Sequence, residues 1–289
     1  MYKTYKRYTV IIANQRLNTY YEIISGGNYH TMGKIIAFAS QKGGTAKTTT
    51  TATFGHALIE RGYKVLFIDL DGQASLTLIL GGKNEPSTST LEVLNNQATV
   101  SEAVEHHNAF DLLPANTRLS NADLKITGTD QDKYTRLKKV LEPIRHQWDY
   151  ILLDCAPSLN VLPINALVCA DEVIVPAYSE ILSVGSLRIL ADMVNIIREK
   201  YNPRLRIAGI LLCRHNQRTN LSKDFTEFLQ DIAGKLGTKV FNTTIRESTR
   251  IREAQALKTS IYQHAPTSTV AQDYQALLDE YLQGGSTHD

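Results

Sequence analysis

The sequence is poor in the residues that form disulfide networks, zinc sites and membrane spans. It has three cysteines, an odd number without a C-x-x-C pair, which argues against a disulfide framework or a structural zinc site. Cys155, Cys169 and Cys213 lie in apolar runs, so we expect buried thiols. No apolar run approaches the roughly 18 residues of a membrane span. The first 31 residues lack the apolar core of a secretory signal, which favours a cytoplasmic location.

A strong charge of either sign is also missing. Thirty-one Lys and Arg residues against 29 Asp and Glu residues give a net charge of +2, which excludes a basic coat for nucleic acid. Any DNA contact therefore has to come from a local patch. Hydrophobic residues make up 43% of the 289 residues, enough for a sizeable core in one large α/β domain or two small ones.

The first 31 residues differ in composition from the rest. They contain six of the fourteen tyrosines, and four basic residues against one acid. Two interpretations stay open: an arm that contacts DNA or a membrane surface, and a poorly ordered or non-native leader ahead of a start at Met32. We therefore expect an N-terminal extension at residues 1–31, one main domain at residues 32–283 and a flexible tail at residues 284–289.

From Met32 onward, short apolar strands alternate with amphipathic helices. The predicted strands are Lys34–Ala39, Lys64–Asp69, Phe110–Leu113, Tyr150–Leu153, Val173–Val175 and Ile207–Leu212. The predicted helices are 47–61, 131–146, 158–169, 182–200, 220–235 and 267–281. This alternation predicts an α/β fold, a mostly parallel twisted sheet with helices on both faces. We find no internal repeat and no linker that divides the chain.

The turn after the first strand has the composition of a phosphate-binding loop. Its glycines let the backbone approach an anion, and the following helix adds the positive end of its dipole. In such a loop Lys47 reaches the β- and γ-phosphates, and the Thr48 hydroxyl holds Mg²⁺. The predicted nucleotide-binding residues are Lys42, Gly43, Gly44, Thr45, Ala46, Lys47, Thr48 and Thr49.

The loop departs from the ordinary G-x-x-x-x-G-K-[ST] pattern. Its first glycine is missing, and the spacing is K-G-G-x-x-K-[ST] with a second lysine, Lys42, at the front. This resembles the deviant Walker A motif of the ParA/MinD family of P-loop NTPases. The resemblance implies that Lys42 crosses a dimer interface to the phosphates of the partner's nucleotide. Two cations beside the γ-phosphate stabilise transition-state charge, which makes Lys42 and Lys47 candidate catalytic residues.

Two acidic motifs follow in the order of that family. The segment VLFIDLDGQ at residues 65–73 is similar to its D-x-D-P-Q switch motif. The similarity implies that Asp71 positions the attacking water and that Asp69 lies near the metal. The segment YILLDCAP at residues 150–157 resembles Walker B, which implies that Asp154 binds Mg²⁺ through water. Each motif alone is weak evidence for a nucleotide site, because apolar strands that end in Asp are common.

Further segments resemble the ParA/Soj-type partition ATPases, from about Gly33 to Leu282. They are LLPA at 112–115, RIREA at 250–254, and HAPTS at 264–268 followed by Tyr274. The resemblance implies an ATP- and Mg²⁺-dependent homodimer that hydrolyses ATP, slowly without a partner. It also implies non-specific binding to double-stranded DNA, a ParB-type centromere-binding partner and a nucleoid-associated location. The function implied is plasmid or chromosome partition.

The implied DNA contacts fall on scattered basic residues. Arg218 and Arg250 match two such positions, and Arg246, Arg252 and Lys258 extend the patch. Arg246 and Arg250 would share a face if this segment is helical. Contacts of this kind are made with phosphates, so the DNA affinity is expected to fall steeply with salt.

Two departures from the family pattern bear on turnover. Thr45-Ala46 replaces the usual Val-Gly, and alanine would be strained if position 46 needs a left-handed backbone. Slower hydrolysis would follow. Gly72 replaces the usual proline and is expected to loosen the switch turn.

Three alternative functions have distinct requirements. A MinD-like membrane ATPase needs a basic amphipathic C-terminal helix, whereas the tail LQGGSTHD at 282–289 is polar and not basic. An iron–sulfur reductase or cluster scaffold needs exposed cysteines in loops. A nucleotide-locked DNA scaffold with little turnover stays open, although Lys47, Thr48, Asp71 and Asp154 are all present.

Overall fold

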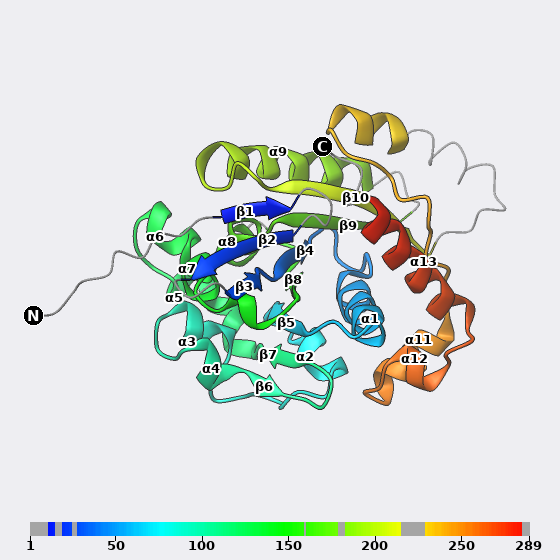
Figure 1. The fold of residues 1–289 in the computed structure, drawn as a ribbon, viewed down its shortest axis with the longest axis horizontal. Helices are drawn as coiled ribbons and strands as arrows, with labels where there is room; N and C mark the ends of the chain where they lie inside the picture. Colours follow the sequence, from blue (N-terminus) through cyan, green and yellow to red (C-terminus); the bar gives the residue numbers. More distant parts are fainter. Residues whose placement is uncertain are drawn as a thin grey trace, which may run out of the picture.

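The computed structural model describes residues 11–14, 19–24, 28–158, 160–178, 183–214 and 229–284. A seven-stranded sheet in the order β10-β9-β4-β8-β5-β7-β6 forms its centre (Figure 1). The strands are β4 (Lys34–Phe38), β5 (Val65–Leu70), β6 (Glu105–His106), β7 (Asp111–Leu113), β8 (Tyr150–Cys155), β9 (Glu172–Tyr178) and β10 (Arg206–Cys213). Neighbouring strands in this sheet are parallel, except β6 and β7. The predicted α/β fold is confirmed.

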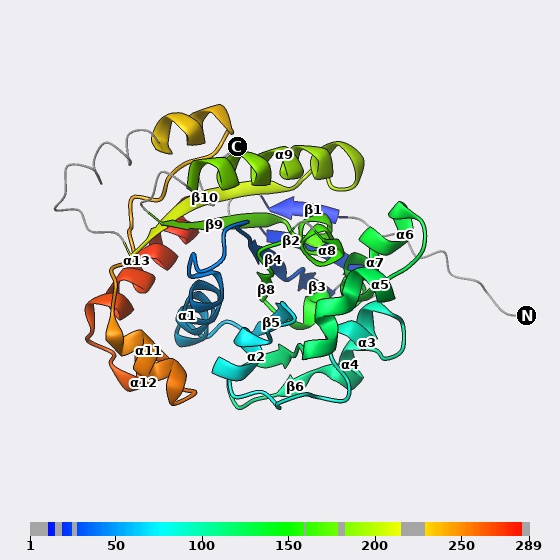
Figure 2. The same cartoon turned by 180° about the vertical axis from the view of Figure 1, so that it is seen from behind.

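Helices cover both faces of the sheet, which is why its central strands are apolar without alternation. One face packs against α1 (Lys47–Glu60), α2 (Ser75–Ile79), α11 (Thr249–Ala256), α12 (Ile261–His264) and α13 (Thr269–Gly284). Figures 1 and 2 show α1 and α13 side by side on this face. In β4, Ile36 and Phe38 point to this layer, whereas Ile35 and Ala37 point to the other.

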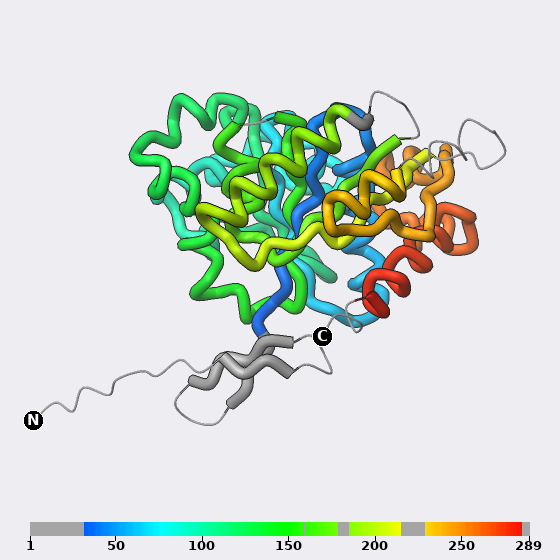
Figure 3. The backbone as a smooth tube through the Cα atoms, turned by 90° about the horizontal axis from the view of Figure 1, so that it is seen from above, coloured from blue at the N-terminus to red at the C-terminus, as the bar shows by residue number. Residues whose placement is uncertain are grey.

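The opposite face is covered by shorter helices and by α9. They are α3 (Thr90–Leu94), α4 (Val100–Ala103), α5 (Ala122–Lys125), α6 (Asp130–Tyr134), α7 (Arg136–Leu141), α8 (Val161–Cys169), α9 (Ser183–Lys200) and helical residues 229–235, with 3₁₀ turns η1 (Thr117–Asn121) and η2 (Arg145–Gln147). Figure 3 shows no separate lobe among its coloured residues, in agreement with the absence of a dividing linker. Within the described ranges, every helix is too short or too polar to span a bilayer.

The predicted strands are all present, but one predicted helix is wrong. Residues 131–146 form α6, α7 and η2 instead of one helix. Pro143 has no N–H to donate, and α7 ends at Leu141. The Thr135 hydroxyl also donates to the Gln131 carbonyl at 2.6 Å, at the junction of α6 and α7. Of the predicted helix 220–235, residues 229–235 are helical and 220–228 lie outside the described residues.

The N-terminal extension contains strands of its own. β1 (Ile11–Asn14), β2 (Thr19–Ile24) and β3 (Asn28–Thr31) form a separate antiparallel sheet in this order. At the other end of the chain, α13 includes Gly284. The remainder of the predicted tail, residues 285–289, lies outside the described residues.

Candidate nucleotide site

The predicted phosphate loop connects β4 to α1. Gly43 and Gly44 are exposed, and no described atom lies within 4 Å of the position where a Cβ would stand on either. An anion can therefore approach this backbone closely. Gly44 has φ +76°, and Ala46, which precedes α1, has φ 67° and ψ 24°. Position 46 thus has the left-handed backbone under which alanine is strained, at a cost of about 1–2 kcal/mol.

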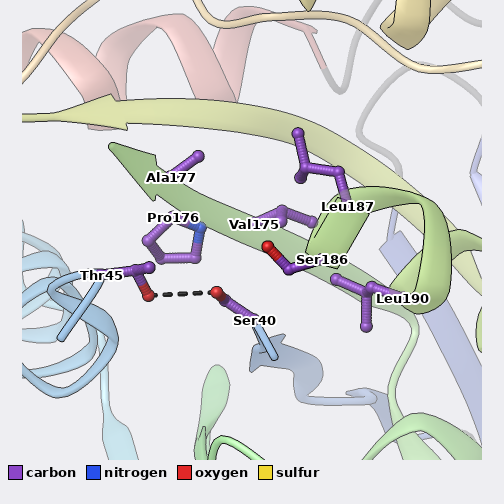
Figure 4. A pocket seen from close by; sticks show the side chains of 8 residues that line it. All are labelled: Ser40, Thr45, Val175, Pro176, Ala177, Ser186, Leu187 and Leu190. Atoms are coloured by element: carbon purple, nitrogen blue, oxygen red, sulfur yellow. Dashed lines mark hydrogen bonds between the residues drawn. The ribbon is translucent and has the colours of Figure 1, made fainter. Parts of the chain in front are cut away.

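Thr45 stabilises the loop through hydrogen bonds of its side chain. Its side chain is buried, and its hydroxyl donates to Ser40 Oγ at 3.1 Å and to the Lys42 carbonyl at 3.3 Å. Figure 4 shows Thr45 and Ser40 pointing toward each other beside Pro176 of β9. The threonine in place of the family's valine therefore keeps an apolar contact with the sheet and adds hydrogen bonds within the loop.

Lys47 lies under the loop, next to the acidic residues. It is 6% exposed, and its Nζ donates to the Lys42 carbonyl at 3.2 Å. Burial lowers the pKa of Lys47, and Asp154, Cys155 and Asp71 partly oppose that shift. The lysine is therefore close to Asp154 and Asp71, two of the three carboxylates that the sequence assigned to the site. Lys42 itself is half-buried.

Asp154 is the least satisfied carboxylate of the site. It is fully buried near the end of β8, and its Oδ2 has no hydrogen-bond partner among the described residues. Burial, followed by the neighbouring Asp69, raises its pKa well above the ordinary value, although a hydrogen bond with Thr48 opposes this. Thr51 Oγ1 donates to Asp154 Oδ1 at 3.4 Å. A buried carboxylate with an unpaired oxygen fits a cation, because opposite charge favours its ionised form.

A magnesium ion is the cation that this donor set fits best. No group of three or more His, Cys, Asp or Glu side chains that could hold a metal occurs in the described part of the chain. Mg²⁺ uses only one or two carboxylates when substrate phosphates and water complete its shell. The Thr48 hydroxyl and the Asp154 carboxylate are two oxygen donors of the kind that such an ion takes from a protein.

Asp69 lies beside Asp154, and its carboxylate accepts hydrogen bonds from the end of β5 and from α2. The two residues face each other in the β5–β8 register. Asp69 Oδ1 accepts from the Asp71 N–H at 3.1 Å, and Oδ2 accepts from the Thr77 N–H and hydroxyl, both at 2.8 Å. These bonds fix the start of α2 next to the site. No pattern in the sequence indicated that Thr77 would contact Asp69.

Asp71 and Gly72 form a tight turn after β5. Asp71 Oδ1 accepts from the Gln73 N–H at 2.9 Å, and the Asp71 carbonyl accepts from the Ala74 N–H at 2.8 Å. A Cβ on Gly72 would stand 2.2 Å from Ser120 Oγ and 2.5 Å from Ser120 N. Glycine here permits close packing against Ser120, whereas the looser turn expected from the missing proline stays a prediction.

The first turn of α1 connects the site to the C-terminal helices. Thr49 Oγ1 accepts from Gln255 Nε2 of α11 at 3.1 Å. The Thr50 hydroxyl lies 3.1 Å from that of Tyr274 of α13, which is fully buried. Neither Gln255 nor these contacts of Thr49 and Thr50 were predicted from the sequence. The run of four threonines after Lys47 was the only available signal.

The comparisons with known proteins agree with this geometry. A family model described as an AAA domain matches residues 33–207. The chromosome partitioning protein ParA of Caulobacter vibrioides is 34% identical over 86% of this chain and 94% of its own length. The sporulation initiation inhibitor protein Soj of Bacillus subtilis is 33% identical over 88% of this chain and 100% of its own length.

The chain belongs to the ParA/Soj family of P-loop ATPases. A solved structure with the same fold is cobyrinic acid a,c-diamide synthase from Mycobacterium smegmatis with bound ADP and magnesium. It has a TM-score of 0.76 and 31% identity, and the match covers 89% of this chain and 96% of that one. The predicted cofactors, ATP and Mg²⁺, are thus those of nucleotide-bound structures of this fold.

One residue of the predicted DNA patch in this ParA/Soj-family chain has a structural role. The condition under which Arg246 and Arg250 would share a helical face is not met, because α11 begins at Thr249 after the Ser248 cap. Arg246 precedes the helix and forms a two-pronged ion pair with Asp273 of α13, at 3.0 Å from Nε and 2.6 Å from Nη2. Its backbone N–H also donates to Asp273, at 3.0 Å.

The other described basic residues of the predicted patch lie at the surface. Arg250 is exposed and pairs with Glu253 at 3.0 Å, and Glu253 also accepts from His264 at 3.1 Å. Arg252 and Lys258 are exposed. Arg218 lies outside the described residues.

The cysteines of this ParA/Soj-family chain are buried, as predicted. Cys155, Cys169 and Cys213 are free thiols inside the core. Burial raises the pKa of each, to about 12 for Cys213. Buried, protonated thiols cannot bridge an iron–sulfur cluster between two subunits, so the iron–sulfur alternative is not supported.

Proposed function

We propose that this chain is an ATP-dependent dimeric switch that binds DNA non-specifically and hydrolyses ATP to drive plasmid or chromosome partition. The observation that carries the nucleotide-dependent part is Asp154, whose unpaired buried oxygen lies beside Thr48 and Lys47 at the loop. The names of the ParA and Soj relatives support the partition part.

Each residue of the site then has a distinct role. Lys47 holds the β- and γ-phosphates, and the backbone of residues 42–49 surrounds them. Thr48 and Asp154 hold Mg²⁺, which neutralises phosphate charge when bound. Asp69 lies beside the ion and, through Thr77, keeps α2 in place.

Two further residues act on turnover in this proposal. Asp71 orients the attacking water and accepts its proton. Lys42 reaches the phosphates bound to the partner subunit, so dimer formation requires a triphosphate. The left-handed Ala46 keeps intrinsic hydrolysis slow, and a ParB-type centromere-binding protein accelerates it.

The DNA surface in this proposal consists of exposed cations near α11, together with Arg218. Arg250, Arg252 and Lys258 contact phosphates, whereas Arg246 is held by Asp273 and supports the surface indirectly. Because the dimer would bind chromosomal DNA without sequence preference, the protein would be cytoplasmic and associated with the nucleoid. The net charge of +2 makes a local patch of this kind necessary.

The remaining alternatives receive less support. A MinD-like membrane function needs an exposed basic amphipathic helix, but the apolar face of α13 is buried and its last turn has no basic residue. A nucleotide-locked scaffold would not need Asp71, which lies next to Lys47 and Asp154.

DNA binding without nucleotide, with ADP and with ATP, across a salt series, tests the proposal. We expect binding with ATP only, and loss of this dependence in Lys42→Ala. Arg250→Ala should reduce the slope of the logarithm of the DNA-binding constant against the logarithm of the salt concentration by about 1. Arg61→Ala is the matched control, since Arg61 is also exposed and paired with one carboxylate, Asp279, at 2.6 Å. DNA binding that needs no nucleotide and is unchanged in Lys42→Ala would contradict the proposed coupling.

Single-turnover ATP hydrolysis tests the role of Asp71 separately. Asp71→Asn should still bind ATP and lose roughly 10²–10⁴-fold in rate, the contribution of a positioned general base. A rate within a few fold of the unsubstituted protein would instead favour the nucleotide-locked scaffold.

A further inference from the structure

A cavity lies at the amino ends of β9 and β10. The phosphate loop lies at the opposite side of the sheet, where the parallel strands have their carboxyl ends. Because these strands are parallel, their first residues, Glu172 and Arg206, lie side by side at this edge. The cavity has a volume of about 520 Å³, within the range of small-molecule sites. Its charged and aromatic lining consists of Glu172, Arg198, Arg206, Lys239, Phe241 and Tyr281.

The lining has more positive than negative charge. The Glu172 carboxylate is its one acid among the described residues, and it is already paired with Lys34 at 2.9 Å and Arg206 at 2.9 Å. It also accepts from the Tyr281 hydroxyl at 2.5 Å. Three cations therefore face the cavity against one satisfied acid, which favours an anionic ligand.

The cations are held in place by the surrounding structure. Arg198 Nε donates to the Leu205 carbonyl at 2.7 Å, and Lys239 Nζ lies 5.1 Å from the centre of the Phe241 ring. Ordered cations lose less entropy when they bind an anion than flexible surface lysines do. Planar guanidinium groups are also suited to phosphate oxygens.

A strand irregularity shapes one wall of the cavity. The β9–β10 register shifts between Ile207 and Gly209, which leaves Ala208 as an extra residue that lines the cavity. A Cβ on Gly209 would stand 2.5 Å from the Phe241 ring, so glycine is needed for this packing. Thr238 Oγ1 ties the following loop to the Ile207 carbonyl at 2.8 Å. β-Bulges commonly occur beside functional sites, and the nucleotide site does not require this one.

We propose that this cavity is a second binding site, for a small phosphate-bearing molecule, distinct from the phosphate loop. Arg198, Arg206 and Lys239 bind the phosphate oxygens. The Phe241 and Tyr281 rings provide the apolar part of the wall. The site does not depend on the proposed partition function.

Calorimetric titration with inorganic pyrophosphate tests this site. The full chain should be used with Lys47→Ala, so that the phosphate loop contributes little to the binding. We expect a Kd below about 1 mM. Lys239→Gln and Arg198→Gln should each weaken binding about tenfold, which corresponds to about 1.4 kcal/mol.

Lys235→Gln is the matched control, because Lys235 is exposed, pairs with Asp231 at 2.6 Å and does not line the cavity. It should leave the pyrophosphate affinity unchanged. Thermal unfolding without pyrophosphate checks that each variant folds. If Lys239→Gln or Arg198→Gln does not fold, the other cavity variant alone tests the site. Absence of binding in the Lys47→Ala chain would overturn the proposal, as would equal weakening by Lys235→Gln.

Discussion

Gln255 Nε2 donates a hydrogen bond to Thr49 Oγ1 at 3.1 Å and thereby joins α11 to the first turn of α1. Thr49 directly follows Thr48, which we propose as a magnesium ligand together with Asp154. Arg250 lies on the same short helix as Gln255. A displacement of the loop on nucleotide binding would therefore be transmitted to the helix that bears a proposed DNA contact.

We predict that Gln255→Leu weakens the dependence of DNA binding on ATP without changing ATP affinity. A hydrogen bond contributes about 1 kcal/mol, so the ATP-induced gain in DNA affinity should fall about fivefold. Nucleotide titration and DNA binding measured on the same samples separate the two effects. Gln272→Leu is the control, since Gln272 Nε2 donates to the Thr267 carbonyl at 3.3 Å on the surface. Unchanged ATP dependence in Gln255→Leu would rule out this connection.

Ala46→Gly should stabilise the fold. Ala46 has φ 67°, where alanine is strained and glycine is not, so the free energy of unfolding should rise by about 1 kcal/mol. The melting temperature should rise by about 2–4 °C. Ala52→Gly, in the buried middle of α1, should do the opposite because glycine weakens a helix interior. If both variants destabilise to the same extent, position 46 is not strained.

Gly72→Ala should destabilise the switch turn. Its Cβ would stand 2.5 Å from the Ser120 backbone nitrogen, which has to move, at a cost of about 1–3 kcal/mol. Urea unfolding measures this loss. Ser120→Gly in addition should restore only part of the stability, because it removes the hydroxyl contact and leaves the backbone contact. Stability equal to that of the unsubstituted protein would contradict the close packing.

Asp154→Asn should remove the magnesium requirement of nucleotide binding. ATP with Mg²⁺ should then raise the melting temperature no more than ATP with EDTA does, because the charged ligand of the ion is gone. The same measurement on the unsubstituted protein should show a clear difference between the two conditions. A preserved magnesium effect in Asp154→Asn would remove this residue from the proposed metal site.

The half-buried His56 predicts one component of the pH dependence of stability. Burial between Phe67 and Phe110 lowers its pKa from 6.5 to about 4. Between these two values the unfolded chain binds the proton more tightly, so this component of stability rises with pH and is lost as pH falls. Its full size is up to about 3 kcal/mol.

Unfolding of His56→Leu at several pH values isolates this component. Buried carboxylates such as Asp69, with a raised pKa, titrate in the same range with the opposite sign, so the comparison with the unsubstituted protein is essential. The stability difference between the two proteins should change between pH 4 and 6.5 and stay constant above pH 7. A difference that does not vary with pH would show that His56 is not buried as described.

The sequence was sufficient for the six parallel strands and the phosphate loop because both have local signals, whereas β6 and the three strands of the N-terminal extension were not predicted. The apolar runs that became β5 and β8 needed no alternation, since both of their faces are covered. The left-handed backbone at Ala46 could be anticipated from the glycine usual at that place. These features depend on a few consecutive residues.

The remaining features depend on contacts between distant residues. No local pattern predicts that Thr77 donates twice to Asp69, that Asp273 pairs with Arg246, or that Ser120 packs against Gly72. The broken helix is different, because Pro143 was a local signal that the amphipathic pattern obscured.

Asp154 belongs to a strand that is hydrogen-bonded on both sides along nearly its whole length. Tyr150–Asp154 pair with β4, and Tyr150–Cys155 pair with β5. Central strands of this kind open only with the whole domain, so the amides of β8 should exchange with solvent most slowly. The strand that carries Asp154 is thus a rigid part of the site. In the proposed function, a conformational change driven by ATP would therefore have to arise in the α1, α2 and α11 segments that adjoin β8.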